Sequence, residues 1–297
     1  MIDIDTRFIT LIGTPLRQSF AARMQNRGYE AAGFNMQYFY TETDETHLRE
    51  IMNGIRFMPS FAGCAVTKPN KIRVLEYLDE LDPLCRKMGA CNTVLRTEDN
   101  RLIGYNTDGM GFYMSISEET DLELEGITCF CIGAGGAGRA ICSSLAYKKA
   151  GKIYICDKNE RNAFDLADDI NRNFGKMAEF VKAGDFSRIP ECSLVINASG
   201  VGMGKSEGET PIPEEYISAD QFCFDACYNP EKTQFLKNAE AKGCRILNGL
   251  GMSLYQGAAQ IKIWTGKDAP IEEMRDELVR INLEKKLNSV PVIEKED

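Results

Sequence analysis

A glycine-rich turn between an apolar segment and a helical pattern constrains the fold of this 297-residue chain more than any other feature. The apolar residues 127–132 run into a G-x-G-x-x-G motif on Gly133, Gly135 and Gly138, and a helix over 136–150 is expected to follow. In this setting the first glycine permits a tight turn, the second lets the backbone approach a pyrophosphate, and the third allows close packing of helix on strand. The motif therefore favours a dinucleotide site at a helix N-terminus over a glycine-rich turn in some other α/β protein.

A carboxylate stands at the end of the next predicted strand, 152–156. Asp157 follows Gly133 at close to the usual spacing of about 20 residues for the acid that hydrogen-bonds the adenine ribose. Because this carboxylate would repel a 2′-phosphate, we expect NAD to be the preferred coenzyme. Lys158 and Arg161 come next and could neutralise a phosphate, so use of NADP stays open. The alternative is that Asp157 only caps the following helix.

Length, charge and cysteine usage limit the class of protein. The chain is too long for one ordinary core and suits two domains. Its net charge of −9 argues against a nucleic-acid partner. It has neither an apolar run of about 18 residues nor a charged-then-apolar leader, so we expect no membrane partner and a cytoplasmic location. The eleven cysteines form no C-x-x-C pair, and several fall in predicted strands, so we expect no disulfides and no metal site.

Histidine chemistry is limited to a single residue. His47 is the only histidine, and it lies in a predicted surface helix over 46–56. A Ser-His-Asp triad or a histidine-dependent dehydrogenase would depend on this side chain, which we expect to be solvated. If the chain is an oxidoreductase, it must move its proton with lysine, tyrosine, aspartate or glutamate.

Strand and helix patterns alternate along the whole chain. Before the glycine motif, the expected strands are 8–12, 34–40, 63–66, 92–96 and 102–105, and the expected helices are 21–27, 46–56, 69–78 and 109–115. After it, the expected strands are 128–132, 152–156, 178–182, 193–198, 221–226 and 245–248, and the expected helices are 136–150, 160–173, 233–242, 253–264 and 271–285. This order predicts an α/β protein with an N-terminal α/β substrate domain and a doubly wound Rossmann domain. We expect residues 1–110, completed by 252–297, to form the first domain and 111–251 the second, with the ligand cleft between them.

Two residues of the first domain are candidates for acid–base chemistry. Lys71 falls in the first turn of a predicted helix that Pro69 opens. An ammonium group there opposes the helix dipole, which suits a general acid and base; a solvated basic patch is the alternative. Asp108, at the start of the helix that bridges the domains, is the best carboxylate partner, although an aspartate there could serve only as an N-cap.

Several separate segments resemble the shikimate and quinate dehydrogenase family, and the match runs from Ile12 to about Glu277. They are 12–16, similar to the opening strand and turn; 66–71, similar to V-T-x-P-x-K; 89–93, similar to G-A-x-N-T; 104–109, similar to G-x-N-T-D-G; 197–203, similar to N-A-T-S-x-G-M; and 249–256, similar to G-x-G-M-x-x-x-Q. The resemblance implies an NAD(P)-dependent enzyme that interconverts a ring hydroxyl and a ketone of a small ring carboxylic acid such as shikimate or quinate. It also implies a monomer or a homodimer.

The resemblance implies a role for individual residues. Lys71 and Asp108 correspond to the catalytic pair. The residues that would hold the substrate are Ser19, Thr67, Asn92, Tyr228 and Gln256. Those that would hold the coenzyme are Gly133, Ala134, Gly135, Gly136, Ala137, Gly138, Asp157, Lys158, Arg161, Ser199, Gly249 and Met252.

The chain departs from the family at the end of the site that binds the carboxylate. Ala21 replaces the second of two serines, Ala65 replaces an asparagine, and Lys68 replaces an apolar residue. Ser19 alone would bind a carboxylate weakly unless Lys68, Arg17 or Arg23 compensates, because a hydroxyl donor to a carboxylate contributes roughly 1.5–3 kcal/mol. The ring acid is therefore shikimate, quinate or an altered relative.

Two other functions compete with this hypothesis. The altered site motivates a non-catalytic, dinucleotide-dependent sensor on the same two domains, but the retained Lys71 and Asp108 argue against it. A methylene-tetrahydrofolate dehydrogenase would need a helical Tyr-x-x-x-Lys pair. Of the two matches, the one at 154–158 spans the end of a predicted strand, and the one at 228–232 contains a proline. Neither therefore predicts such a helix.

Overall fold

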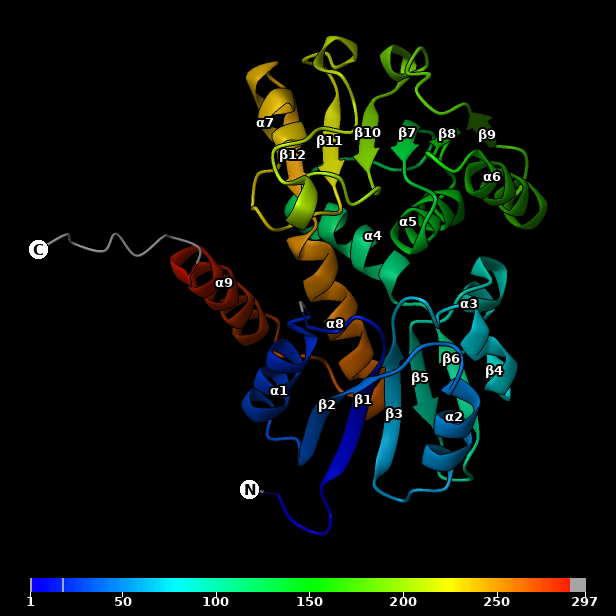
Figure 1. Ribbon diagram of the computed structural model, residues 1–297, viewed down its shortest axis with the longest axis vertical. Helices are drawn as coiled ribbons and strands as arrows, with labels where there is room; N and C mark the ends of the chain where they lie inside the picture. Colours follow the sequence, from blue (N-terminus) through cyan, green and yellow to red (C-terminus); the bar gives the residue numbers. More distant parts are fainter. Residues whose placement is uncertain (1, 18, 289–297) are drawn as a thin grey trace, which may run out of the picture.

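A computed structural model describes residues 2–17 and 19–288, which form two α/β units placed end to end (Figure 1). Each unit is built around its own six-stranded sheet, and helices α4 (Asp108–Glu119) and α8 (Leu250–Thr265) lie between them. The predicted two-domain α/β class is confirmed. The predicted boundaries, after 110 and after 251, fall inside α4 and α8 and stay predictions. Residues 289–297, which we assigned to the first domain, lie outside the described residues.

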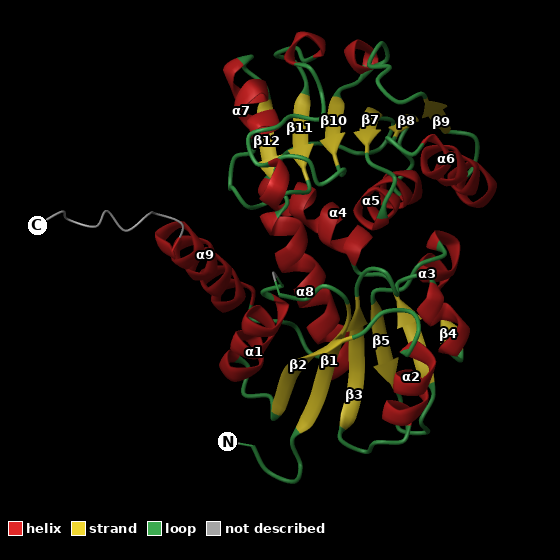
Figure 2. Cartoon of the chain, in the orientation of Figure 1, coloured by secondary structure: helices red, strands yellow, loops and turns green. Residues whose placement is uncertain are grey.

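The N-terminal sheet has the strand order β2-β1-β3-β5-β6-β4. Strands β2, β1 and β3 are parallel, and β5 runs antiparallel to both β3 and β6. The antiparallel pair β5 and β6 is the hairpin predicted from the sequence. The strands are β1 (Arg7–Gly13), β2 (Met36–Glu42), β3 (Phe61–Val66), β4 (Glu80–Leu81), β5 (Thr93–Arg96) and β6 (Leu102–Tyr105). One face packs against α1 (Ala21–Ala31), α8 and α9 (Ile271–Asn288), and the other against α2 (Leu48–Arg56) and α3 (Pro83–Met88) (Figure 2).

The second sheet is fully parallel, with the order β12-β11-β10-β7-β8-β9. Its strands are β7 (Thr128–Ile132), β8 (Lys152–Cys156), β9 (Ala178–Val181), β10 (Leu194–Asn197), β11 (Phe222–Asp225) and β12 (Arg245–Asn248). Helices α4, α5 (Gly136–Tyr147) and α6 (Glu160–Phe174) cover one face, and α7 (Gln234–Ala241) packs on the other. The strand order reverses between β7 and β10, which is where such sheets bind ligands at the carboxyl ends of their strands.

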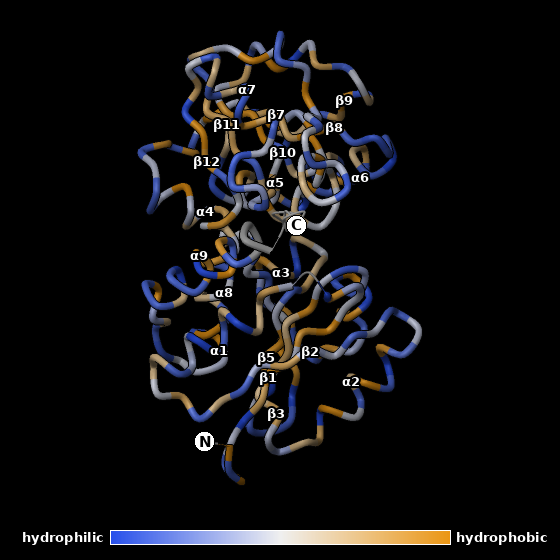
Figure 3. The backbone as a smooth tube through the Cα atoms, turned by 60° about the vertical axis from the view of Figure 1, so that its left-hand side comes forward, coloured by the Kyte–Doolittle hydropathy of each residue, from blue (hydrophilic) through white to orange (hydrophobic). Residues whose placement is uncertain are grey.

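Hydrophobic stretches follow the strands of both sheets, as Figure 3 shows. Parallel strands covered on both faces need apolar residues on both sides, and all six residues of β3 are buried. All eleven cysteines are buried and free, as expected for small apolar residues of a core. Among the described residues, none of the helices is long and apolar enough to cross a membrane, and no cluster of side chains could hold a metal ion.

The segment after β3 differs from the prediction. Residues 69–78 do not form an α-helix: turns lead into a short 3₁₀ helix, Arg73–Tyr77, that begins after Lys71. The expected opposition between the Lys71 ammonium group and a helix dipole is therefore wrong. Helix α3 and the two-residue strand β4 were not predicted either. Further short 3₁₀ helices span Ile189–Glu191, Gly204–Ser206 and Glu214–Tyr216.

Candidate active site

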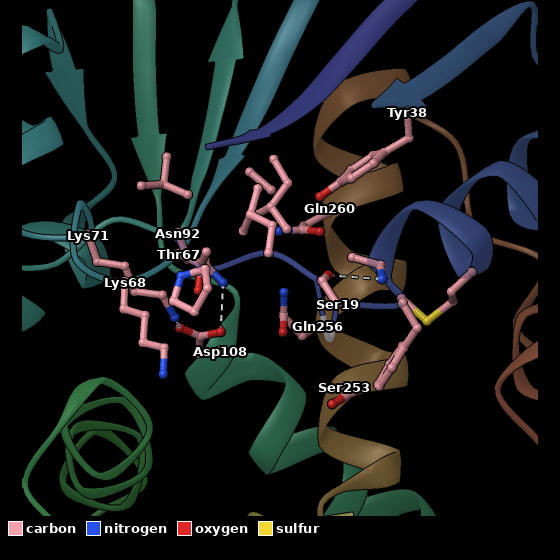
Figure 4. A pocket seen from close by; sticks show the side chains of 18 of the residues that line it. Ser19, Tyr38, Thr67, Lys68, Lys71, Asn92, Asp108, Ser253, Gln256 and Gln260 are labelled. Carbon is pink, nitrogen blue, oxygen red and sulfur yellow. Dashed lines mark hydrogen bonds and ion pairs between the residues drawn. The ribbon is translucent and has the colours of Figure 1, made fainter. Parts of the chain in front are cut away.

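A cavity of about 540 Å³ opens at the carboxyl ends of β1 and β3, on the side that faces α4 and α8 (Figure 4). Its wall brings together all seven residues predicted to be catalytic or to hold the substrate, although they come from segments far apart in the sequence. They are Ser19, Thr67, Lys71, Asn92, Asp108, Tyr228 and Gln256. The exposed His47 does not line this cavity.

Lys71 and Asp108 form an ion pair in the wall of the cavity. The distance between Lys71 Nζ and Asp108 Oδ2 is 2.6 Å, and the two side chains are only 21% and 8% exposed. Asp108 is the first residue of α4, whose N-cap is Thr107. Among the described residues, the hydrogen bonds to its carboxylate come from Lys71 and Asn92 and not from the backbone of the helix. The structure therefore contradicts both alternatives, a solvated patch for Lys71 and an N-cap for Asp108.

A buried amide holds the second oxygen of this carboxylate. Asn92 Nδ2 donates to Asp108 Oδ1 at 2.8 Å, while Asn92 Oδ1 accepts the backbone N–H of Thr107 at 2.7 Å. Asn92 is 1% exposed, and its amide is engaged by these protein groups. Each carboxylate oxygen of Asp108 thus accepts one hydrogen bond, which fixes the direction in which Lys71 is held.

The remaining predicted substrate residues present polar groups around the cavity. Ser19 Oγ accepts the N–H of Ala21 at 3.3 Å, and the side chains of Thr67 and Gln256 are half-buried and form no hydrogen bond with another described residue. The Tyr228 ring packs edge-on against Phe20, with centroids 4.9 Å apart. Burial raises the pKa of Tyr228 to about 12, so its phenol is protonated at neutral pH and can donate a hydrogen bond.

The cationic side chains near the cavity differ in whether they form ion pairs with carboxylates. Arg23 binds Glu277 at 2.6 Å and also pairs with Glu284, both on α9, so it is not available to a ligand. Arg17 and Lys68 are exposed, line the cavity and form no ion pair with another described residue.

Three polar lining residues were not predicted. Tyr38 lies on β2, and Ser253 and Gln260 lie on α8. The helical pattern could have predicted Ser253 and Gln260, because residues three positions before and four positions after Gln256 share its face of the helix.

The glycine motif forms a loop beside this cavity. Gly133 has a φ of +106°, and a Cβ there would lie 2.4 Å from the carbonyl carbon of Ala198, so the loop passes close to the end of β10. A Cβ on Gly138 would lie 1.8 Å from Gly133 O, whereas one on Gly135 would meet nothing within 4 Å. A Cβ on Gly136 would point at Lys71 Cδ, 3.9 Å away, so the loop lies beside the ion pair.

The loop has the features that a dinucleotide needs. Gly135 and Gly136 are exposed at the start of the twelve-residue helix α5, where backbone N–H groups lack helical partners. Gly135 leaves open the space that a close approach to a pyrophosphate requires. Ala134 comes directly before this pair of glycines and Ala137 directly after it. Ser199, exposed after the end of β10, donates its hydroxyl to Asn197 Oδ1 at 2.6 Å.

Asp157 is tied to the same loop. Its Oδ2 accepts the N–H of Ala134 at 2.6 Å, and its Oδ1 accepts the N–H of Asn159 at 2.8 Å. The N-cap of α6 is Asn159, so the N-cap alternative for Asp157 is wrong. Lys158 is exposed without an ion-pair partner among the described residues, and Arg161 pairs with Asp165 at 2.9 Å.

Gly249 and Met252 stand where α8 leaves the second sheet. A Cβ on Gly249 would lie 2.2 Å from Ala226 O, which explains the glycine by close packing. Met252 is 8% exposed, and its side chain belongs to the hydrophobic core of the second unit. A Cβ on Gly111 would lie 2.3 Å from the backbone oxygen of Met252, so α4 and α8 pack closely at this point.

Together, a dinucleotide-type glycine loop and a Lys–Asp pair at the meeting of two α/β units define a two-domain oxidoreductase.

Two family models match the chain. The shikimate dehydrogenase substrate binding domain matches residues 11–94, and the shikimate 5'-dehydrogenase C-terminal domain matches residues 249–279. The shikimate dehydrogenase (NADP(+)) of Desulforamulus reducens is 36% identical over 277 residues, which cover 92% of this chain and 94% of the relative. The chain belongs to the shikimate dehydrogenase family.

Solved structures agree with this family. Shikimate 5-dehydrogenase from Listeria monocytogenes, in complex with shikimate and NAD, superposes with a TM-score of 0.88 at 34% identity, covering 93% of this chain and 98% of that one. Quinate dehydrogenase from Corynebacterium glutamicum, in complex with NAD, gives a TM-score of 0.85 at 27% identity, covering 93% and 99%.

Proposed function

We propose that this chain is an NAD(P)-dependent dehydrogenase that interconverts a ring hydroxyl and the corresponding ketone of a small ring carboxylic acid, shikimate or quinate or a close relative. The observation that carries this proposal is the Lys71–Asp108 ion pair, which lies both in the wall of the cavity and beside the glycine loop. The names of the Desulforamulus, Listeria and Corynebacterium relatives support the same reaction.

Lys71 is the proposed group that moves the proton. The glycine loop and Asp157 would hold NAD(P), which when bound would supply the acceptor for the hydride that leaves the carbon carrying the hydroxyl. In its neutral amine form Lys71 Nζ takes up the hydroxyl proton as the carbonyl forms, and in the reverse direction its ammonium form returns this proton to the carbonyl oxygen. Asp108 accepts a hydrogen bond from Nζ, so it both aims the lysine and stabilises the ammonium form that the oxidation produces.

Around this pair, the remaining polar groups orient the ring. The Thr67 hydroxyl and the Gln256 amide have no other partner among the described residues, and the phenol of Tyr228 is protonated. These groups suit the several hydroxyls of a polyhydroxylated ring. Asn92 acts mainly on Asp108, because its own amide is already engaged.

Arg17 and Lys68 are the proposed recognition groups for the carboxylate. The segments that carry them follow the neighbouring parallel strands β1 and β3 and are joined by a hydrogen bond from Thr14 N–H to Lys68 O at 3.0 Å. Among the described residues of the wall, Asp108 is the only acid, and it is paired with Lys71, so these residues give the cavity a positive charge in a chain of net charge −9. These cations would compensate for Ala21 and Ala65, which offer no donor.

The role of these cations is tested with the Lys68→Met variant. The control is Lys242→Met, which replaces an exposed lysine at the end of α7. We expect Lys68→Met to raise the KM for the acid about tenfold, the effect of a charge-assisted interaction of about 1.4 kcal/mol, with kcat unchanged. Unchanged KM values in Lys68→Met and in Arg17→Met would rule out both cations as the anion site.

NAD is the proposed preferred coenzyme, on the basis of the Asp157 carboxylate at the end of β8. The NAD complex of the Listeria relative supports this choice, whereas the name of the Desulforamulus relative specifies NADP. The test is the ratio of kcat/KM for NAD to that for NADP, before and after Asp157→Asn, which keeps an oxygen for the Ala134 N–H. The ratio should favour NAD and fall in the variant. A wild-type preference for NADP, or an unchanged ratio, would overturn the proposal.

The substrate is tested with a panel of ring acids. Shikimate, quinate and their neutral methyl esters are assayed with both coenzymes. At least one acid should be oxidised, and its ester should have a much higher KM because it lacks the charge that Arg17 and Lys68 recognise. Turnover of none of these acids with either coenzyme would contradict the proposed function.

A further inference from the structure

A chain of buried hydrogen bonds leads from α1 to the ion pair. On α1, Gln25 Nε2 donates both to Gly257 O at 3.1 Å and to Gln260 Oε1 at 3.0 Å. On α8, Gln260 Nε2 donates to the hydroxyl of Thr93 on β5, again at 3.0 Å. These three side chains are 0–2% exposed, so solvent cannot replace their hydrogen bonds.

The chain continues from Thr93 to the carboxylate. The Thr93 hydroxyl donates to Asn92 Oδ1 at 2.8 Å, and Asn92 Nδ2 donates to Asp108 Oδ1 at 2.8 Å. Asp108 in turn accepts Lys71 Nζ. Five side chains thus lead from α1 through α8 and β5 to Asp108 on α4, which holds the group proposed to move the proton.

The groups at the two ends of this chain of hydrogen bonds decide which partner donates in each bond between them. A backbone carbonyl only accepts, so Gly257 O requires the NH₂ group of Gln25, which then also faces Gln260 Oε1. This leaves Gln260 with its NH₂ toward Thr93. Gln25 Oε1 is buried and has no hydrogen-bond partner among the described residues. The opposite orientation of the Gln25 amide would be worse, because it would place Oε1 against both Gly257 O and Gln260 Oε1.

The other end sets the same direction independently. The N–H of Thr107 only donates, so it requires Asn92 Oδ1, and the carboxylate of Asp108 accepts from Asn92 Nδ2. Thr93 has one hydroxyl proton, and it points at Asn92 Oδ1, the nearer acceptor at 2.8 Å, while the Thr107 hydroxyl lies 3.2 Å away. The two ends therefore agree on one arrangement of every amide between them.

We infer that Thr93 and Gln260 are positioning residues for the reaction: together with the Thr107 N–H they hold the Asn92 amide in the orientation that donates to Asp108, and so keep Lys71 aimed at the substrate. This inference rests on the proposed function of Lys71 and Asp108. Neither residue has to touch the reacting atoms. Thr93 acts directly on Asn92, and Gln260 acts on Thr93, so removing the first should cost more than removing the second.

The experiment compares Thr93→Val, which removes the hydroxyl at nearly constant volume, with Thr93→Ser, which keeps it. Thr10→Val is the matched control, because Thr10 is a buried threonine of β1 in the same sheet whose hydroxyl bonds Thr41, at 2.7 Å, and no other residue that the structure describes. Thr93→Val should lower kcat roughly tenfold, the value of one hydrogen bond of about 1.4 kcal/mol, with KM for the acid and Kd for the coenzyme unchanged. Thr93→Ser and Thr10→Val should keep kcat within about twofold of the wild type.

A second variant separates positioning from a loss of substrate contact. Gln260→Met should lower kcat less than Thr93→Val. A higher KM with unchanged kcat in Gln260→Met would instead make Gln260 a substrate contact and overturn its assignment.

The last variant tests the dependence on Lys71. Adding Thr93→Val to Lys71→Ala should cause no further loss of turnover, since the positioned group is gone. Equal kcat in Thr93→Val and the wild type, while Lys71→Ala is impaired, would overturn this inference alone. Normal turnover in Lys71→Ala would instead overturn the proposed function.

Discussion

Two glycines of the same motif should respond to the same substitution in opposite ways. Gly138 lies where a Cβ would be 1.8 Å from Gly133 O, against an ordinary contact of 3.4–4 Å. The Gly133 carbonyl cannot retreat easily, because Gly133 itself is close to Ala198. At Gly135 a Cβ would meet nothing within 4 Å, and the backbone is extended, with φ of −73° and ψ of −165°.

These distances give different magnitudes for the two alanine variants. Gly138→Ala overpacks a buried backbone contact, which costs about 1–3 kcal/mol and lowers Tm by roughly 2–10 °C. Gly135→Ala should not lower Tm, and it should stabilise the fold by about 0.4–1 kcal/mol because alanine loses less backbone entropy on folding. Its methyl group would nevertheless occupy the space that a pyrophosphate needs, so the affinity for coenzyme should fall tenfold or more, at least about 1.4 kcal/mol.

The assay combines thermal unfolding with titration of reduced coenzyme followed by its fluorescence. Gly138→Ala should lose both stability and affinity, and Gly135→Ala should lose affinity alone. Wild-type affinity for both NADH and NADPH in Gly135→Ala would show that no pyrophosphate passes over this residue. A wild-type Tm in Gly138→Ala would refute the packing argument.

Three other perturbations test separate parts of the molecule. Asp108→Asn should lower kcat by about 10²-fold or more at unchanged coenzyme Kd, because it removes the charge that orients Lys71; a loss of Tm without a loss of kcat would contradict this. Burial raises the pKa of Asp225, so the folded state holds its proton more tightly than the unfolded state, and stability is lost as pH rises through the raised pKa. In urea unfolding, Asp225→Asn should therefore gain stability relative to the wild type between about pH 4 and pH 7, and a constant difference would contradict this. Ala21→Ser combined with Ala65→Asn should lower the KM for shikimate or quinate, and no change for either acid would mean that the site is built for another ligand.

The nucleotide-binding half could be predicted because its signals are local. The glycine loop, the strand that precedes it and the Asp157 position lie within about 30 residues, the size of one βαβ unit. Close packing accounts for Gly133 and Gly138 in the structure, as the motif implies. The sequence did not reveal that Asp157 binds the loop itself, through the Ala134 N–H.

Errors in the first unit arose where periodicity is a weak guide. The apolar spacing of residues 69–78 fits an α-helix, but the chain forms turns and a short 3₁₀ helix there. The helix-dipole argument for Lys71 is therefore wrong, although Lys71 lines the cavity and pairs with Asp108. Helix α3 was missed because six residues are too few for a periodic pattern. Its end signals were present all the same: Asp82 caps Leu84 and Cys85, and Gly89 ends the helix in the left-handed conformation.

Contacts between distant segments could not be read from the sequence. Arg23 was a candidate anion ligand, but it binds Glu277, which is 254 positions away on α9. Gln260 reaches Thr93 only because α8 returns to the first sheet. Such pairings depend on how complete elements pack, whereas motifs and periodicity describe one element at a time.

The most direct test of the Lys71 assignment is the single-turnover rate of Lys71→Ala with the acid that the wild type oxidises best. We expect a decrease of about 10²- to 10⁴-fold in the rate, with the Kd for coenzyme unchanged, because the substitution removes the proton-transfer group and leaves the glycine loop intact. Lys242→Ala, at the exposed end of α7, serves as the control and should react at the wild-type rate. A rate for Lys71→Ala close to that of the wild type would contradict the assignment of Lys71 as the group that moves the proton.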